Sequence, residues 1–428
     1  MKRTMERFLL VVLAAACALA PARAQDWETP PPAEADLAQC YTWAREQSES
    51  LRMQEEQIRQ LEQQFRIALS GALPALSFNA SDKWLDSASG SNATSAAPSQ
   101  PQVNFAVSQL LFSGLREYAA MAAAKHQGQA AELQLRRARG LLYQNVSAAF
   151  YLVVALETGL ANSRSAIALI MNRIAELRRF EALGRSRHSE VVLVESQQAA
   201  LEAQAESQRG QIEAARELLS FLTGKELARA KLLDRLERLR TLDPEEAMLG
   251  RAYDRSDVLA LRKLVDAQED QVRIAKGAWA PSVSFLGNYY LKRQRALDPI
   301  KWDAGVAASL PLFAGGGQLA AVRQADSQVS QARYAFELGL RQARSEIHTA
   351  YVTLRAALAN AAANEKAYRK ADESYRLETK EYRAGLVTNL DVLAALNALV
   401  SAKTTFDASV VQMKLALLQL KVATEELP

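Results

Sequence analysis

The chain has 428 residues, of which 49% are hydrophobic and 23% charged, and a formal net charge of +4 at pH 7. Residues 1–24 carry four basic side chains and one acidic side chain, so their removal would lower the net charge by 3, to +1. A nearly neutral chain with interspersed charges has no electrostatic footprint for nucleic acid, which excludes that class of partner.

The first 24 residues are typical of a secretory signal peptide. Three basic side chains lie among the first seven residues, the stretch Phe8–Ala20 is apolar, and Ala22-Arg23-Ala24 forms a cleavage motif. The alternatives are an uncleaved membrane anchor, or lipidation at Cys17, whose preceding alanines loosely resemble a lipobox. If Cys17 is removed with the signal, Cys40 has no partner for an internal disulfide, so packing must stabilise the mature chain.

The mature chain contains the same unit twice. The segment Leu110–Gly114 aligns with Pro311–Gly315 at an offset of 201 residues, and this offset continues to the pair Gly184 and Gly385. Ahead of these segments the offset is 207, so the halves differ by a six-residue insertion. We therefore expect a signal peptide, a first repeat, an inter-repeat connection and a second repeat, at residues 1–24, 25–224, 225–254 and 255–428.

In the first repeat, alternating apolar and polar residues predict strands at about 74–82 and 102–111. The connection 87–101 between them is rich in Ser, Ala, Gly and Pro, which predicts a flexible loop at an exposed hairpin tip. An alanine-rich, proline-free helical stretch then runs from Gly114 to about Leu183. Each repeat is completed by a further helix after its Gly184 or Gly385 turn.

The second repeat follows the same order. A helical pattern at Asp257–Lys276 ends before Pro281, and strands are predicted at about 281–292 and 301–311. The second long helical stretch runs from Gly317 to about Ala384. Nearly seventy helical residues extend roughly 100 Å, so each long helix needs neighbours along its whole length. A cytoplasmic coiled-coil rod is the alternative for these helices, but the signal peptide and the strands argue against it.

The four predicted strands suit the wall of a membrane barrel. Each runs about nine or ten residues, with one apolar face and one small or polar face, as lipid outside and water inside require. Aromatic residues gather at these strands where interfacial girdles would lie, namely Trp84, Tyr289, Tyr290 and Trp302. A half-buried sheet in a soluble domain would alternate in the same way. Because four strands cannot close a barrel, the barrel interpretation requires an oligomer.

Several short motifs, in this order and duplicated, resemble the TolC-like outer membrane efflux protein family. They are Arg255–Val258 (RSDV), Ala280–Ser284 (APSVS), Pro311–Gly316 (PLFAGG), Tyr382–Leu386 (YRAGL) and Asp391–Leu393 (DVL). The resemblance implies a mainly α protein built from a duplicated helix-hairpin-helix-helix unit. It also implies a homotrimer in which each chain gives four strands to one shared outer-membrane β-barrel, continued by a long periplasmic α-barrel.

The same resemblance implies a function and partners. The chain would be the outer-membrane channel of a tripartite efflux or type I secretion system in a Gram-negative-type bacterium. Its partners would be a periplasmic adaptor (membrane fusion protein), an inner-membrane efflux pump or ABC transporter, and outer-membrane lipid. Residues Gly184, Ala384, Gly385 and Leu386 match the periplasmic tip that contacts the adaptor. From the residues alone, a glycine between two helices is a helix C-cap in either case.

The family's pore gate falls on Asp391, its counterpart Glu190, and Tyr382. In a trimer each carboxylate would become a ring of acids, which favours cations. The alternative is that an acidic residue near a helix start complements the helix dipole. The family's gate arginine and second gate aspartate fall on Val387 and Ala394, so this chain departs from much of that lock.

No pattern of catalytic or metal-binding residues stands out, and neither an enzyme nor a cofactor is expected. The histidines His126, His188 and His348 are far apart and lack ligand spacing with Cys40 or with one another. The glycines at 315–317 lack a following Gly-Lys-Ser/Thr, so they indicate a strand-to-helix turn rather than a phosphate site. The alternative function from another class is an exported coiled-coil structural or adhesive protein without a pore.

Overall fold

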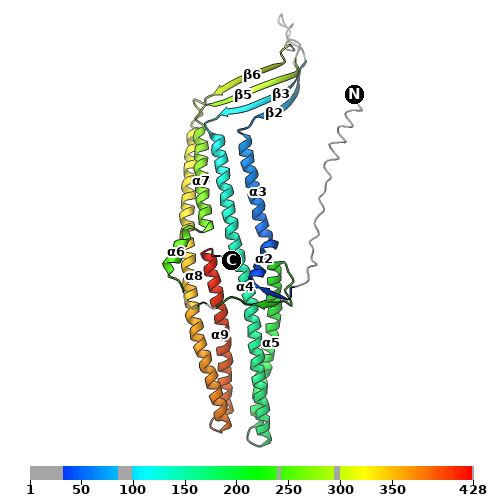
Figure 1. Cartoon of the computed structure of the whole chain (residues 1–428), viewed down its shortest axis with the longest axis vertical. Coiled ribbons are helices and arrows are strands. Elements are labelled where there is room, and N and C mark those ends of the chain that lie inside the picture. Colours follow the sequence, from blue (N-terminus) through cyan, green and yellow to red (C-terminus); the bar gives the residue numbers. More distant parts are fainter. Residues whose placement is uncertain (1–31, 85–98, 238, 240–241, 294–298, 427–428) are drawn as a thin grey trace, which may run out of the picture.

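The computed structural model describes residues 32–84, 99–237, 239, 242–293 and 299–426. The predicted signal peptide with Cys17 lies outside these residues, as does most of the 87–101 connection. The chain is elongated: a four-stranded sheet stands at one end, and long helices run from it to two helical turns at the opposite end (Figure 1).

The described elements follow one another in a mainly helical order. They are β1 (Glu34–Asp36), α2 (Leu37–Gln47), α3 (Glu49–Ser70), β2 (Ala75–Trp84), β3 (Ser99–Phe112), α4 (Arg116–Ala182), α5 (His188–Thr223), β4 (Lys231–Leu233), α6 (Glu245–Gly250), a 3-10 turn η1 (Arg251–Tyr253), α7 (Ser256–Gly277), β5 (Ser282–Lys292), β6 (Trp302–Ser309), α8 (Gly317–Arg383) and α9 (Asn389–Ala423).

The elements β2, β3, α4 and α5 recur as β5, β6, α8 and α9. The helices α4 and α8 each have 67 residues, and their first residues, Arg116 and Gly317, are 201 positions apart. The helices α5 and α9 begin at His188 and Asn389 with the same offset. Strand and helix bounds lie within a few residues of those that the periodicity predicts.

The four strands form one antiparallel sheet in the order β2-β3-β5-β6. The register places apolar side chains on one face, with Phe78 opposite Phe105, their ring centroids 5.3 Å apart, and Tyr289 opposite Trp302. The other face carries a polar ladder in which Asn104 donates to Asn288 over 3.0 Å. The two faces therefore have the opposite polarities that the alternating sequence predicts.

The loop predicted at 87–101 was given the wrong C-terminal boundary, because Ser99, Gln100 and Pro101 belong to β3. Proline has no backbone N–H to donate, but β5 begins to pair with β3 only at Val103, so Pro101 needs no bond on that side. On its other side Pro101 lies opposite Asp82 of β2. The proline therefore marks a half-paired strand end and not a loop.

The middle of the molecule contains elements that the sequence did not predict. The connection 225–254 includes β4, α6 and η1, and β4 pairs in parallel with β1 near the N-terminal side of the described chain. The adjoining core packs Cys40 and Tyr41 of α2 against Val146 and Phe150 of α4. This connection crosses the helices at mid-length and ties the two repeats together (Figure 1).

Shorter helices lie beside the long ones in pairs. The helices α3 and α5 pack along α4, α9 packs along α8, and α7 packs along both α4 and α8. Where α9 ends and α7 begins, the Glu425 carboxylate accepts hydrogen bonds from the backbone N–H and the hydroxyl of Ser256, at 3.0 and 2.7 Å. Glu425 thus satisfies one of the free N–H groups at the start of a helix 169 residues away in sequence.

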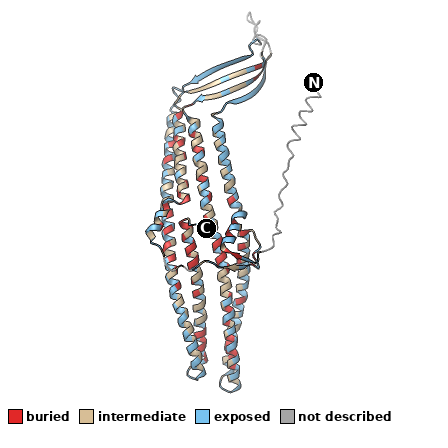
Figure 2. Cartoon of the chain, in the orientation of Figure 1, coloured by how far each residue is buried: buried red, intermediate tan, exposed pale blue. Residues whose placement is uncertain are grey.

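Among the described residues, α4 contains a window that is long and apolar enough to cross a membrane, by length and composition only. The sequence past residue 24 has no run of eighteen uninterrupted apolar residues, which predicts no membrane-spanning helix there. Of this window, 44% is buried inside the protein, where it packs against neighbouring helices. Figure 2 shows buried residues along the facing sides of the helices and exposed ones over most of the sheet.

Gly114 and Gly315 occupy equivalent turns ahead of α4 and α8, at φ of 71° and 60°, and differ in their surroundings. A Cβ on Gly114 would lie 2.4 Å from the Gly277 carbonyl oxygen, whereas nothing lies within 4 Å at Gly315. Both Gly→Ala changes should lower the free energy of unfolding by about 1 kcal/mol or more, because alanine disfavours a left-handed backbone. G114A is destabilised further by the clash with the Gly277 carbonyl. Its melting temperature, measured by circular dichroism, should therefore be lower than that of G315A. Equal melting of the two variants would contradict this close contact.

Candidate functional site

The turns that connect α4 with α5 and α8 with α9 form the end of the molecule remote from the sheet (Figure 1). Gly184 and Gly385 have φ of 69° and 78°, and a Cβ on either would have nothing within 4 Å, so backbone conformation and not space favours glycine. The residue after each glycine caps the end of the preceding helix. Arg185 N–H donates to the Phe180 carbonyl at 2.8 Å, and Leu386 N–H donates to the Glu381 carbonyl at 3.0 Å. The expected glycine C-caps are therefore present at both turns.

Asp391 occupies the first turn of α9 and forms a capping box with Thr388. Its carboxylate accepts from the Thr388 hydroxyl at 2.6 Å and from the Thr388 backbone N–H at 2.8 Å. These hydrogen bonds hold the pKa of Asp391 below its ordinary value. In the single chain Asp391 thus caps a helix, and the carboxylate is exposed and ionised at neutral pH.

Glu190 and Tyr382 lie near each other at the same end. Glu190 accepts a hydrogen bond from the Ser186 hydroxyl at 2.7 Å. Burial raises the pKa of Tyr382; the charge of Arg173 opposes the rise, and the Glu190 carboxylate adds to it. The Tyr382 ring also lies against Phe180, with centroids 6.0 Å apart. The structure therefore groups Glu190 with Tyr382, whereas the Asp391 carboxylate bonds to Thr388.

Sequence reasoning missed the buried arginine at this end. Arg173 of α4 is 4% exposed, and its guanidinium carbon lies 3.7 Å from the centroid of the Tyr382 ring. Its position is the signal that could have revealed it, because it lies at helical spacing between the apolar residues Ile170, Ile174 and Leu177. A charged residue on an apolar helix face needs a partner in the fold.

The aromatic residues expected at the membrane interface divide between the two faces of the sheet. Trp84, Tyr289 and Trp302 are 77%, 54% and 67% exposed, and the register places Tyr289 and Trp302 together on the apolar face. Tyr290 is 7% exposed and lies on the polar face, where Arg293 covers its ring at 3.6 Å. Adjacent residues of a strand point to opposite faces, so Tyr290 does not share the apolar face with Tyr289.

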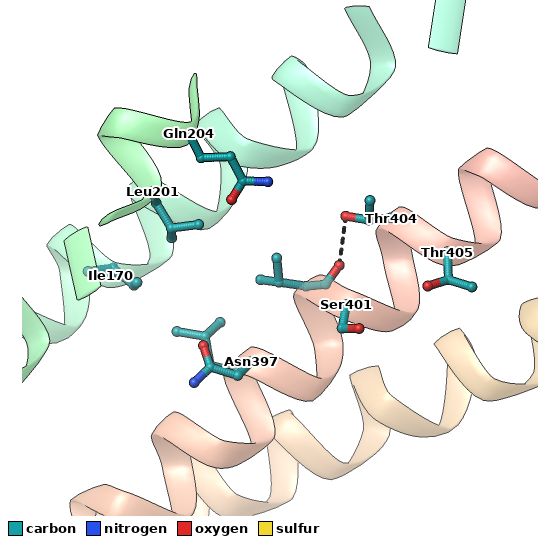
Figure 3. A pocket seen from close by; sticks show the side chains of 9 residues that line it. Ile170, Leu201, Gln204, Asn397, Ser401, Thr404 and Thr405 are labelled. Atoms are coloured by element: carbon teal, nitrogen blue, oxygen red, sulfur yellow. Dashed lines mark hydrogen bonds between the residues drawn. The ribbon is translucent and has the colours of Figure 1, made fainter. Parts of the chain in front are cut away.

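A cavity of about 290 Å³ separates the α4–α5 pair from α9 (Figure 3). Its lining combines apolar side chains with hydroxyls and amides: Ile170, Leu201, Gln204, Leu396, Asn397, Val400, Ser401, Thr404 and Thr405. The Thr404 hydroxyl donates to the Val400 carbonyl at 2.9 Å. Because this lining holds no titratable side chain, the cavity has no group for acid–base catalysis.

The three histidines pair with three different carboxylates. His126 contacts Asp270 at 2.9 Å, His188 contacts Glu181 at 2.9 Å, and His348 contacts Glu245 at 2.5 Å. Within the part of the chain that the structure describes, no cluster of three or more His, Cys, Asp or Glu side chains could hold a metal ion. Each histidine thus contacts a carboxylate of its own.

Comparisons with known proteins agree with this architecture. Residues 252–424 match the outer membrane efflux protein family. Outer membrane efflux protein BepC of Brucella suis biovar 1 (strain 1330) is 26% identical over 314 residues, which cover 70% of this chain and 67% of the relative. The outer membrane protein VceC of Vibrio cholerae has 22% identity and a TM-score of 0.78, covering 91% of this chain and 95% of that one. CusC has 17% identity and a TM-score of 0.80, and the match covers 92% of this chain and 93% of that one.

Long paired helices joined to a four-stranded sheet are the fold of TolC-like outer-membrane channels. The predicted resemblance to the outer membrane efflux protein family is confirmed by the match of residues 252–424 and by the relative BepC. The chain is located in the outer membrane with a large periplasmic part, and it functions as a channel for efflux or secretion. The comparisons give no support to an exported coiled-coil structural or adhesive protein without a pore.

The capping box predicts different stabilities at the starts of α9 and α5. Substituting Thr388→Ala removes the side-chain cap and should cost about 1 kcal/mol, seen as faster amide hydrogen exchange in the first turn of α9. Arg187 holds the equivalent position ahead of α5 and makes no side-chain cap hydrogen bond. Arg187→Ala should therefore leave exchange at the start of α5 unchanged. Unaltered exchange in T388A would show that the capping box does not stabilise this turn.

Proposed function

We propose that three copies of the chain close one shared β-barrel in the outer membrane and that their long helices continue it as a periplasmic α-barrel. The observation that carries this proposal is the sheet with two unpaired edges, since every residue of β2 and β6 is exposed in the single chain. A bilayer offers no hydrogen-bond partner to a free strand edge. Four strands are also too few to close on themselves, because about eight are needed.

In this arrangement Trp84, Tyr289 and Trp302 contact the lipid headgroups. Their exposure on the membrane sheet supports this role, because aromatic side chains with a polar edge favour the membrane–water interface. Tyr290 is left out of this belt, since it lies on the polar face that would line the water-filled interior. The two repeats at 25–224 and 255–428, joined by 225–254, each supply one hairpin to the barrel.

The periplasmic tip consists of Gly184, Ala384, Gly385 and Leu386 and docks a periplasmic adaptor. That adaptor connects the channel to an inner-membrane efflux pump or ABC transporter. Two features support a docking role: the turns lie at the end remote from the membrane sheet (Figure 1), and Leu386 is 75% exposed there. A large apolar side chain at an exposed turn is suited to contact with another protein.

The gate of the channel consists of Asp391, Glu190 and Tyr382. Threefold symmetry makes a ring of three carboxylates from each acid, and such a ring in a narrow pore favours cations. The exposed, ionised state of Asp391 supports this role, because its bonds to Thr388 leave the charge in place. Capping and gating are compatible, since one carboxylate oxygen takes both bonds from Thr388.

The oligomeric state tests the proposal most directly. Protein extracted from membranes in mild detergent should be a homotrimer by light scattering, with a mixed α and β circular dichroism spectrum. The expectation follows from the two open sheet edges, which only further strands can pair. A monodisperse monomer under these conditions would overturn the shared barrel.

Ion selectivity tests the acidic gate. Asp391→Asn removes the charge but keeps an oxygen that accepts from Thr388, so the helix start should remain capped. The cation preference, measured from reversal potentials across a planar bilayer in a salt gradient, should weaken in D391N and weaken less in E190Q. T388A serves as the control that loses the cap and keeps the charge. If both acid variants match the parent channel, these acids only cap and anchor the turns.

A further inference from the structure

One buried charged side chain joins the two helical hairpins near the tip. Arg173 of α4 donates from Nε and Nη2 to the Asn389 Oδ1 atom, at 2.9 and 2.7 Å, and from Nη1 to Glu176 at 2.8 Å. Asn389 is the first residue of α9 and is 4% exposed, as is Arg173. The guanidinium thus spans from one hairpin to the start of the last helix of the other.

The same group also holds the end of α8. The Tyr382 ring lies over the guanidinium at 3.7 Å, and Glu176, which binds Arg173 through Oε2, receives Arg383 Nε on Oε1 at 3.0 Å. Arg173 and Glu176 therefore fix both sides of the α8–α9 turn against α4. We call the five residues Arg173, Glu176, Tyr382, Arg383 and Asn389 the tip clamp.

The helix dipole does not explain this arrangement. The start of a helix carries partial positive charge, so a cation placed beside Asn389 at the start of α9 is disfavoured there. A buried guanidinium is retained only where its N–H groups are satisfied, and here the Asn389 oxygen, the Glu176 carboxylate and the Tyr382 face supply those partners. Removing any one leaves a buried charge partly unsatisfied and weakens the contact between the hairpins.

We infer that Arg173 is a further gate residue, a positioning residue that holds the α8–α9 turn against α4 and thereby sets the width of the channel tip. The inference rests on the proposed channel function and adds to the gate residue Tyr382 a closing contact made by Arg173 and its partners. Arg173 acts through Tyr382 and through the first turn of α9, which carries Asp391. Releasing the clamp lets the α8–α9 turn move away from α4 and widens the opening.

The test compares Arg173→Met with a matched arginine on the same helix. Arg178 is exposed and pairs with Glu195 of α5 at 2.7 Å, so its contact stays within one hairpin. Purified trimers are inserted into planar bilayers in symmetric salt, and their thermal stability is followed separately on gels. R173M should raise the single-channel conductance severalfold, and R178M should leave it at the wild-type value. Wild-type conductance in folded R173M trimers would overturn the assignment, because a merely structural arginine changes only trimer stability.

A second pair of variants tests the clamp independently, should R173M fold poorly. Asn389→Asp keeps the oxygen acceptors and adds a charge opposite to that of Arg173, so it should tighten the clamp, lower the conductance and raise the melting temperature of the trimer. Asn389→Leu removes the acceptor and should open the channel to the same extent as R173M, with no further increase in the double variant. Unchanged conductance in N389D and N389L would overturn the clamp. Wild-type trimers that conduct no ions would instead overturn the channel function itself.

Discussion

The unpaired edges of the four-stranded sheet constrain everything else in this structure. The strands β2 and β6 expose all their residues, while β3 and β5 between them are partly covered. Within lipid no water can bond to free backbone groups, so a fold with open edges is incomplete as a single chain. The exposed apolar residues Leu312 and Phe313, just after β6, fit the same explanation, because they lack cover within their own chain. Stability of the membrane part is thus inseparable from assembly.

Duplication gave the chain two similar hairpins, but the two ends have diverged. The α8–α9 turn has a side-chain capping box at Thr388, whereas the α4–α5 turn has none at Arg187. The first hairpin instead contributes Arg173 and Glu176 to the contact between hairpins. One hairpin thus has the helix start with a side-chain cap, and the other supplies charged groups that contact it.

The sequence predicted those features that depend on local patterns. Alternation located the strands, the absence of proline predicted helices of nearly seventy residues, and Gly184 and Gly385 located the turns, because each signal acts over a few neighbouring positions. The contacts that failed to be predicted join distant residues: β1 with β4, and Arg173 with Asn389, 216 positions away. Tyr290 shows a further limit, since composition indicates an aromatic belt but only the register shows which face a ring occupies.

The bond between Glu425 and Ser256 bears on the order in which the chain acquires its structure. The Glu425 carboxylate accepts from the backbone N–H of the first residue of α7, yet the two residues are separated by 169 positions. Closing so large a loop is entropically unfavourable until the intervening helices α8 and α9 have folded back on each other. The start of α7 therefore gains this cap only in a chain whose α8 and α9 have brought Glu425 back beside it.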